Sequence, residues 1–318
     1  MPVELIVEIT NNCNLACIMC PRPNMTRSVG FMEPDLFRRI IDQVKDCAEL
    51  VYLSGGLGDP LLHPKYADMV RYAVENGVRV GISTNAGMMT KRHVDTILDA
   101  RPDILLFSLD GARKETHEKI RVGSQFERTM AGVEEFLEEK ERRGLKKPHT
   151  VCQMIYMPDN QHEAEEFRRK WNRFPAVDEV RLKKFLFLQG ADYGPETNPD
   201  SPDHSKWSCI LPWRQLAIGF DGTVAICCRD LDFSNPIGNV RDMPIADIWN
   251  SDKMVLYREY LATKRKSELS VCKNCGTIRT NTVTRFGATV LDALSIRKLL
   301  PVFERLVLKT GITLTDYE

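Results

Sequence analysis

Residues 3–20 read VELIVEITNNCNLACIMC, an apolar run that is followed at once by three cysteines. The run predicts a short buried strand, because buried parallel strands are almost continuously apolar. Cys13, Cys17 and Cys20 would then lie in one loop at the carboxyl end of this strand. Structural zinc and an ordinary four-iron cluster each take four protein ligands, and the next cysteine, Cys47, falls at the end of a predicted helix. The pattern therefore predicts a metal centre with one open position, and a zinc loop or plain core thiols are the alternative.

The first part of the chain alternates short apolar runs with longer amphipathic segments. The predicted strands are Val3–Ile9, Leu50–Leu53, Val78–Ile82, Ile104–Leu109, Thr150–Tyr156 and Val180–Phe187. The predicted helices are Pro34–Ala48, Pro64–Asn76, Lys91–Ala100, Phe126–Gly144 and His162–Phe174. Right-handed crossovers curl such a sheet into a full or partial barrel, whose active site lies at the carboxyl ends of the strands. The sequence therefore predicts an α/β fold built on a partial (β/α)6 barrel.

A second, smaller unit is predicted after residues 189–208, a segment rich in proline and glycine. Asp221-Gly222 is a strong hairpin signal within this unit. The elements expected around and after it are the strands Leu216–Phe220 and Thr223–Cys227 and the helices Ile245–Leu261 and Val290–Leu308. The chain is thus divided into a barrel (1–188), a linker (189–208), a cysteine-rich unit (209–276) and a helical tail (277–318). A core this small needs a cross-link or a metal centre to be stable.

Composition excludes several classes of function. The 318 residues include 44 basic and 44 acidic side chains, so no net positive field attracts nucleic acid or an anionic membrane. No apolar run is long enough to span a bilayer, and Glu4 and Glu8 interrupt any secretory signal, which predicts a cytoplasmic protein. Disulfides are rare in that compartment, so the ten cysteines are expected to be metal ligands, reactive thiols or small core residues.

The C-x3-C-x2-C spacing after the first strand resembles that of the radical S-adenosylmethionine (radical SAM) superfamily. In this family three cysteines hold a [4Fe–4S] cluster, and S-adenosylmethionine chelates the fourth iron through its amino and carboxylate groups. The resemblance implies that Cys13, Cys17 and Cys20 bind this cluster. It also implies that an external electron donor, such as flavodoxin or ferredoxin, drives cleavage of the cofactor to methionine and a 5′-deoxyadenosyl radical.

Three further segments resemble the cofactor pocket of the family. Residues 54–60, SGGLGDP, resemble the glycine-rich turn that holds the cofactor's amino group, with aspartate where glutamate is usual. The segments STN (83–85) and SLDG (108–111) each follow a predicted strand, and Arg121 stands where relatives often place a basic group near the cofactor's carboxylate. The residues implied in cofactor binding are Gly55, Gly56, Gly58, Asp59, Ser83, Asn85, Ser108, Arg121 and Met19. A tight turn for the glycines and a solvated surface charge for Arg121 are the alternatives.

A second set of thiols lies in the small unit, at Cys209, Cys227, Cys272 and Cys275. Four cysteines that include a C-x2-C pair are also a common zinc arrangement. The surrounding motifs resemble the SPASM/Twitch auxiliary-cluster domain, and they are CILPW (209–213), ICC (226–228), IGNV (237–240) and DIW (247–249). The resemblance implies one auxiliary [4Fe–4S] cluster, as in the shorter Twitch form, and the cysteine layout is close to that of aminocyclitol dehydrogenases of the superfamily.

Several remaining residues are candidates for the substrate site. Cys228 is expected to face away from Cys227, toward the barrel mouth, where it could donate hydrogen. Lys183 and Lys184 are expected to point opposite ways, so that one ammonium could hold a hydroxyl or carboxylate inside the barrel. Five other residues have no function assigned to them. Cys47 and Cys152 are expected to be small core residues and His63 a polar loop residue, and the sequence leaves the roles of Asp230 and Arg214 open.

The fate of the substrate radical separates the possible functions. With a fully ligated auxiliary cluster as electron acceptor, a secondary alcohol becomes a ketone, so a dehydrogenase is predicted first. Hydrogen donation by Cys228 would instead give an epimerase. A small polyol or amino sugar is favoured over a peptide, because the first strand begins at Val3 and leaves no room for a peptide-recognition domain. Peptide modification remains a third possibility, and a non-catalytic zinc-binding protein is the alternative from another class.

Overall fold

The computed structural model describes residues 1–54, 57–185, 209–263, 265–273 and 275. Six parallel strands lie side by side in chain order. They are β1 (Glu4–Val7), β2 (Leu50–Leu53), β3 (Val80–Thr84), β4 (Ile104–Ser108), β5 (His149–Tyr156) and β6 (Glu179–Lys184). Within the described strands β6 pairs with β5 alone, so the curved sheet is open. The predicted partial (β/α)6 barrel is confirmed.

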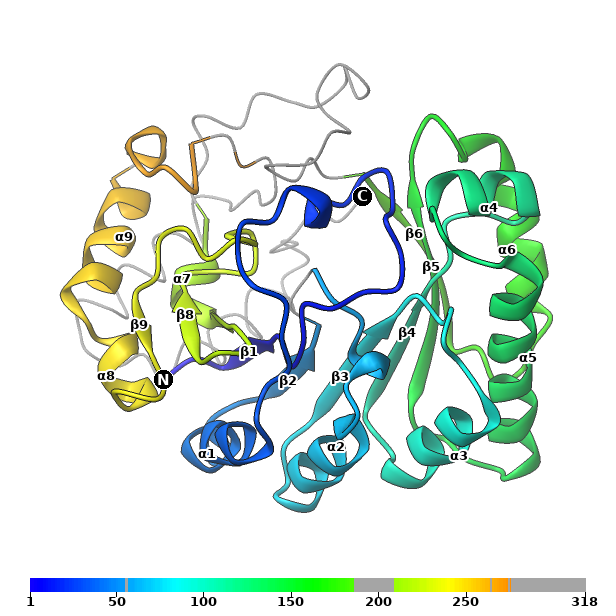
Figure 1. Cartoon of the computed structure of the whole chain (residues 1–318), viewed down its shortest axis with the longest axis horizontal. Helices are drawn as coiled ribbons and strands as arrows, with labels where there is room; N and C mark the ends of the chain where they lie inside the picture. The colour runs from blue at the N-terminus through cyan, green and yellow to red at the C-terminus, as the bar shows by residue number, and fades with distance from the viewer. Residues whose placement is uncertain (55–56, 186–208, 264, 274, 276–318) are drawn as a thin grey trace, which may run out of the picture.

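Helices cover the outer face of this sheet, as Figure 1 shows. They are α1 (Pro34–Val44), α2 (Tyr66–Glu75), α3 (Lys91–Ala100), α4 (Lys114–Ile120), α5 (Phe126–Arg142) and α6 (Ala164–Asn172). Short 3-10 turns occupy Arg22–Asn24, Pro60–Leu62, Gln161–Glu163 and Lys266–Glu268. The sequence analysis missed α4, because seven residues with three buried side chains give too short a periodic pattern. None of the described helices is both long and apolar enough to cross a membrane.

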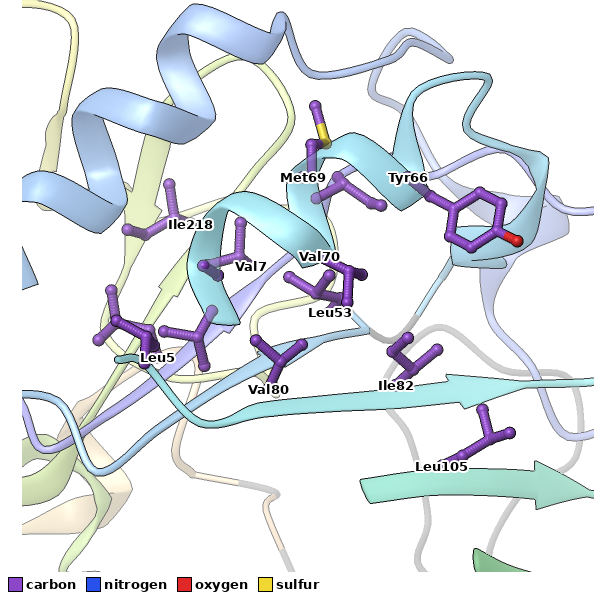
Figure 2. Close-up of a cluster of buried hydrophobic side chains, with 14 of the residues drawn as sticks. Leu5, Val7, Leu53, Tyr66, Met69, Val70, Val80, Ile82, Leu105 and Ile218 are labelled. Carbon is purple, nitrogen blue, oxygen red and sulfur yellow. The ribbon is translucent and has the colours of Figure 1, made fainter. Parts of the chain in front are cut away.

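The barrel core lies between the sheet and the helices. Alternate residues of β1, Leu5 and Val7, are fully buried on the helix side, whereas Glu4 and Ile6 face the other way and are half-buried. Figure 2 shows the resulting cluster, in which Met69 and Val70 of α2 pack over aliphatic side chains of the sheet. Full burial of one such side chain contributes about 1.5–3 kcal/mol, so this layer contributes much of the stability of the sheet.

The second unit extends the same sheet. Its strands are β7 (Gln215–Ile218), β8 (Thr223–Ala225) and β9 (Gly238–Asn239). β7 pairs in parallel with β1, in the register Glu4 with Gln215, and β8 returns antiparallel to it, which confirms the predicted hairpin. Ile218 and Val224 belong to the same buried cluster as Leu5 and Val7. The two expected units therefore share one sheet and one core. A unit with few apolar residues of its own buries more of their surface when it packs against a larger unit.

Three short helices complete this unit, α7 (Leu211–Arg214), α8 (Ile245–Trp249) and α9 (Asp252–Ala262). The single helix predicted over Ile245–Leu261 is wrong, since it is broken between α8 and α9. Ser251 accepts a hydrogen bond from the Met254 amide at 3.4 Å and starts a new helix as its N-cap. The predicted linker (189–208) and the tail with its helix over Val290–Leu308 lie outside the described residues.

Candidate active site

The three cysteines after β1 lie in one loop that is fixed on both sides. Cys13, Cys17 and Cys20 are all half-buried, and the Cys20 amide donates to the Cys17 carbonyl at 3.0 Å. The flanking amides of Ala16 and Ile18 donate to the carbonyls of Val122 and Ile120, so the end of α4 anchors this loop. Burial raises the pKa of Cys17 to about 12. Without a metal this thiol keeps its proton at neutral pH, and a bound iron would replace that proton.

The glycine-rich turn packs directly against the cysteine loop. Gly55 and Gly56 lie outside the described residues. A Cβ on Gly58 would lie 2.0 Å from the Thr10 carbonyl oxygen, so glycine is required here by the approach of two backbone segments. The next amide, that of Asp59, donates to the Asn12 carbonyl at 2.8 Å. The turn and the cysteine loop are therefore held together by direct backbone contacts.

Asp59 is buried, and its carboxylate accepts hydrogen bonds from other groups of the protein. It accepts hydrogen bonds from the Thr84 hydroxyl (2.9 Å), the Asn85 amide (2.8 Å) and the Leu61 amide (3.0 Å). Burial raises its pKa despite these bonds. The side chain thus joins the glycine-rich turn to the end of β3, which suits a positioning role better than direct contact with a cofactor.

Asn85 lies beside the first cysteine set. Its Nδ2 donates to Asn14 Oδ1 at 3.0 Å and lies 3.6 Å from Cys13 Sγ. Ser83 and Ser108 are half-buried at the ends of β3 and β4, the neighbouring strands of the sheet. The structure therefore brings the polar pocket candidates to one edge of the sheet, and cofactor binding by each of them stays a prediction.

Arg121 is a buried cation, so the surface-charge interpretation is wrong. It is 6% exposed, and its Nη2 donates to Asp110 Oδ2 at 2.6 Å. Its Nη1 lies 3.9 Å from Cys17 Sγ, and among the described residues its Nε has no hydrogen-bond partner. A donor held beside the cluster loop in this way suits a cofactor carboxylate. Asp110, which orients it, was not singled out from the sequence, although it lies in the quoted SLDG segment.

Met19 forms an apolar wall on the same side of the loop. It is buried against Ile120, Met157 and Phe185, and Cys17 packs against this cluster. The position is compatible with the predicted thioether contact to an adenine ring. Phe185, directly after β6, is an additional pocket residue that the sequence analysis did not name.

The second cysteine set also comes together. Cys209, Cys227, Cys272 and Cys275 line one cavity, whose other walls include Leu211, Leu261 and Val271. Burial raises the pKa of Cys209 and of Cys272 to about 12. In the part of the chain that the structure describes, no three His, Cys, Asp or Glu side chains are grouped so as to hold one metal ion. Four thiols around one cavity are the ligand number of a [4Fe–4S] cluster and also of a structural zinc ion.

Cys228 has different surroundings from Cys227, as predicted. It packs beside Ala217 and Ala225, and Ala217 is the register partner of Ile6, whose side chain faces away from the helices. The sequence predicts that the two cysteines face opposite ways because they would alternate along a strand. However, β8 already ends at Ala225, so both lie in the turn after it. Lys183 of β6 is half-buried and close enough to Cys228 for the two charges to interact. The side chain of Lys184 lies outside the described residues.

The remaining candidates have structural roles. His63 is buried, with Nε2 bonded to the Met32 carbonyl (2.9 Å) and Nδ1 accepting from the Lys65 amide (3.0 Å). Asp230 accepts bonds from the amides of Ser234 and Asn235, and Arg214 pairs with Glu4 at 2.8 Å. Two thiols pack in the core, Cys47 and Cys152.

The geometry agrees with comparisons to known protein families. The family model described as the radical SAM superfamily matches residues 7–170, which is just over half of the chain. The chain belongs to the radical SAM superfamily. The model described as the SPASM iron–sulfur cluster-binding domain matches residues 209–276 of this radical SAM protein. A [4Fe–4S] cluster with S-adenosylmethionine and additional iron–sulfur chemistry in the second unit follow from these two matches.

Two full-length relatives and one solved structure resemble this radical SAM enzyme. The tungsten-containing aldehyde ferredoxin oxidoreductase cofactor-modifying protein of Pyrococcus furiosus is 26% identical over 299 residues, 80% of this chain and 82% of the relative. The S-adenosyl-L-methionine-dependent 2-deoxy-scyllo-inosamine dehydrogenase of Niallia circulans is 21% identical over 290 residues, 88% and 95% of the two chains. The crystal structure of BtrN with AdoMet and 2-DOIA has a TM-score of 0.60 at 18% identity and covers 89% of this chain and 94% of BtrN.

Proposed function

We propose that this radical SAM enzyme dehydrogenates a secondary alcohol of a small polyol or amino-sugar-like substrate, with the auxiliary cluster as electron acceptor. The observation that carries the proposal is the cavity lined by Cys209, Cys227, Cys272 and Cys275. Four thiolates fill every iron position of a [4Fe–4S] cluster, so a substrate cannot bind to it directly and electron transfer is the role left. The resemblance to an aminocyclitol dehydrogenase over most of both chains supports the same choice.

The bound groups would supply the radical, and the chain would supply position and exclusion of water. When bound, the first cluster and S-adenosylmethionine provide a 5′-deoxyadenosyl radical that takes one hydrogen atom from the substrate carbon. The substrate radical then releases the hydroxyl proton and one electron to become a ketone. Arg121 and Asn85 would hold the cofactor, and the apolar side chains of Met19 and Phe185 would exclude water from the radical. An external donor such as flavodoxin or ferredoxin would deliver the first electron.

Cys228 supports a second candidate, radical epimerisation. Its thiol lies on the inner face of the β1–β7 pair, near Lys183. A thiol at this place could return a hydrogen atom to the opposite face of the substrate radical, which gives an epimer and a thiyl radical. Lys183 would hold a hydroxyl or a carboxylate of the substrate in either reaction.

The substrate screen should extend beyond sugars. The relative from Pyrococcus furiosus is named for modifying a cofactor of another enzyme, so cofactor-like compounds belong beside polyols and amino sugars. Peptides remain the third class. Formation of a ketone with one equivalent of 5′-deoxyadenosine would support dehydrogenation, whereas an epimer that is lost in Cys228→Ala would support epimerisation.

The first experiment is an iron and sulfide determination after anaerobic reconstitution. We expect about eight irons per chain in the wild type and about four in the Cys13→Ala, Cys17→Ala, Cys20→Ala triple variant. A wild type with about four irons, and a triple variant that contains zinc and no iron, would remove the electron acceptor and contradict the dehydrogenase proposal. The triple variant should also form no 5′-deoxyadenosine.

A further inference from the structure

Arg229 lies at the auxiliary cavity and close to two residues that are predicted for the substrate site. It follows Cys228 in the turn after β8, and its side chain lines the cavity together with the four cysteines. Its backbone amide donates to Cys227 Sγ at 3.4 Å. Lys183 and Cys228 both lie close enough to Arg229 for its positive charge to act on them. Arg229 is thus a neighbour of the auxiliary cavity and of two residues that are predicted for the substrate site.

The guanidinium of Arg229 lacks a counter-charge within the described residues. Its Nε is buried without a hydrogen-bond partner, and no described carboxylate forms an ion pair with it. Its charged neighbour on β6, Lys183, is itself a cation. Arg229 is half-buried, and placing such a cation beside another cation is unfavourable unless an anion compensates the charge. The other cation of the cavity wall, Lys266, already donates to the Cys275 carbonyl.

A bound cluster would supply the missing anion. Four thiolates carry more negative charge than the iron–sulfide core carries positive charge, so a cluster in this cavity is a net anion. Reduction by one electron makes it more negative still. A nearby cation stabilises the reduced state more than the oxidised state, and charge and hydrogen bonds near the sulfurs are known means of setting cluster potentials.

We propose that Arg229 is a positioning residue for the auxiliary cluster, whose positive charge compensates the cluster and raises its reduction potential. The inference rests on the proposed function, since it explains how this cluster becomes an acceptor for an electron leaving the substrate. Arg229 would act through the cluster and would not contact the reacting carbon.

The test is a redox titration of the auxiliary cluster alone. The Cys13, Cys17, Cys20 triple alanine variant provides the background, because only the second cysteine set then holds iron. Arg229→Gln and Arg229→Met remove the charge, Arg229→Lys keeps it, and Lys253→Gln removes an exposed charge elsewhere in the same unit. The midpoint potential is followed by electron paramagnetic resonance of the reduced cluster, and iron is counted in every sample.

We expect a lower midpoint potential in both neutral variants and little change in Arg229→Lys and Lys253→Gln. Loss of iron in both neutral variants, with full iron in Arg229→Lys, would equally support compensation by charge. Unchanged potentials with full iron, or loss of iron in all three Arg229 variants, would overturn the role of Arg229. No substrate is used, so these outcomes leave the dehydrogenase proposal standing, whereas a triple variant without any iron–sulfur signal would overturn that proposal instead.

Discussion

At the scale of single residues, the first cysteine site depends on buried charge. Asp110 is fully buried and accepts hydrogen bonds from Arg121 (2.6 Å) and from the Ile155 amide (2.6 Å). Its φ of 51° lies in the left-handed region, which is unfavourable for a residue with a Cβ. The fold holds Asp110 in this conformation through its own hydrogen bonds. Asp110 therefore decides where the guanidinium of Arg121 lies relative to Cys17.

Asp110→Asn should leave Arg121 buried without its anion. Breaking one partner of a buried ion pair costs about 3–5 kcal/mol, because the remaining charge is uncompensated. We expect a loss of this size in the free energy of unfolding, measured by chemical denaturation. Asp35→Asn, which breaks an exposed pair with Arg38, is the matched control and should have little effect. Equal stability of the two variants would contradict the role assigned to Asp110.

Gly58→Ala tests whether the glycine-rich turn must touch the cysteine loop. The new Cβ would lie 2.0 Å from the Thr10 carbonyl oxygen, so one of the two backbone segments has to move. We expect a folded protein that binds S-adenosylmethionine weakly and forms little 5′-deoxyadenosine. Gly77→Ala meets no atom within 4 Å and should cost about 1–2 kcal/mol of stability through its φ of +78° while it leaves the cofactor chemistry intact. Wild-type turnover in Gly58→Ala would show that this contact is dispensable.

At the scale of elements, α4 connects a strand end to the cysteine loop. His117 of this helix is fully buried, and its Nδ1 bonds the Leu109 carbonyl while its Nε2 lies 2.9 Å from the Ser124 hydroxyl. Burial, and next to it the charge of Arg121, lowers the pKa of His117 to about 4. The imidazole is therefore neutral in the folded protein throughout the physiological range.

The lowered pKa of His117 predicts a loss of stability on mild acidification. The unfolded chain takes up a proton near the usual pKa of 6.5, whereas the folded protein does so near 4, so stability present above pH 6.5 is lost as the pH falls between these values. At 1.36 kcal/mol per pH unit the full effect is about 3 kcal/mol. Urea denaturation between about pH 7 and about pH 4 measures it. His117→Gln should flatten this part of the profile, and an equally steep profile in that variant would refute the assignment.

Local patterns predicted most elements, and long-range contacts explain the misses. The apolar runs Val3–Ile9 and Leu50–Leu53 identified their strands, because such runs are short-range signals of burial. The parallel pairing of β1 with β7 joins segments more than 200 residues apart, and no local signal specifies it. The cysteine spacings located both sites for a similar reason, since several cysteines of each site lie within a few residues of one another in the sequence. The Asp110–Arg121 pair depends on the position of α4 and was missed.

At the scale of the whole molecule, the shared sheet makes the two units depend on each other. β7 covers the edge of β1, and Ile218 and Val224 complete the core beneath it. A second contact joins Arg27, in the segment after Cys20, to the buried Glu8 through two bonds (2.8 and 2.9 Å), and to the Leu231 carbonyl at 2.9 Å. The loop of the first site is thus fixed to the unit that carries the second.

A chain truncated to residues 1–188 should therefore fail as an isolated domain. Removal of β7 exposes the hydrogen-bonding edge of β1 and part of the apolar core, and such an edge pairs with other molecules. We expect aggregation in size-exclusion chromatography and no reconstituted cluster. In the full-length protein, unfolding monitored by the absorbance of either cluster should occur at the same denaturant concentration. A monomeric truncated chain that still cleaves S-adenosylmethionine would contradict this interdependence.

The β1–β7 pair also has a consequence for the two cysteine sets. Cys13 follows the carboxyl end of β1, whereas Cys209 precedes the amino end of β7, and the two strands run in parallel. The chain segments that carry Cys13 and Cys209 are therefore joined to opposite ends of the strand pair. The pair is buried in the core that both units share, so it joins the two sets rigidly. We therefore expect the separation between the two redox centres to stay constant while the proposed reaction proceeds.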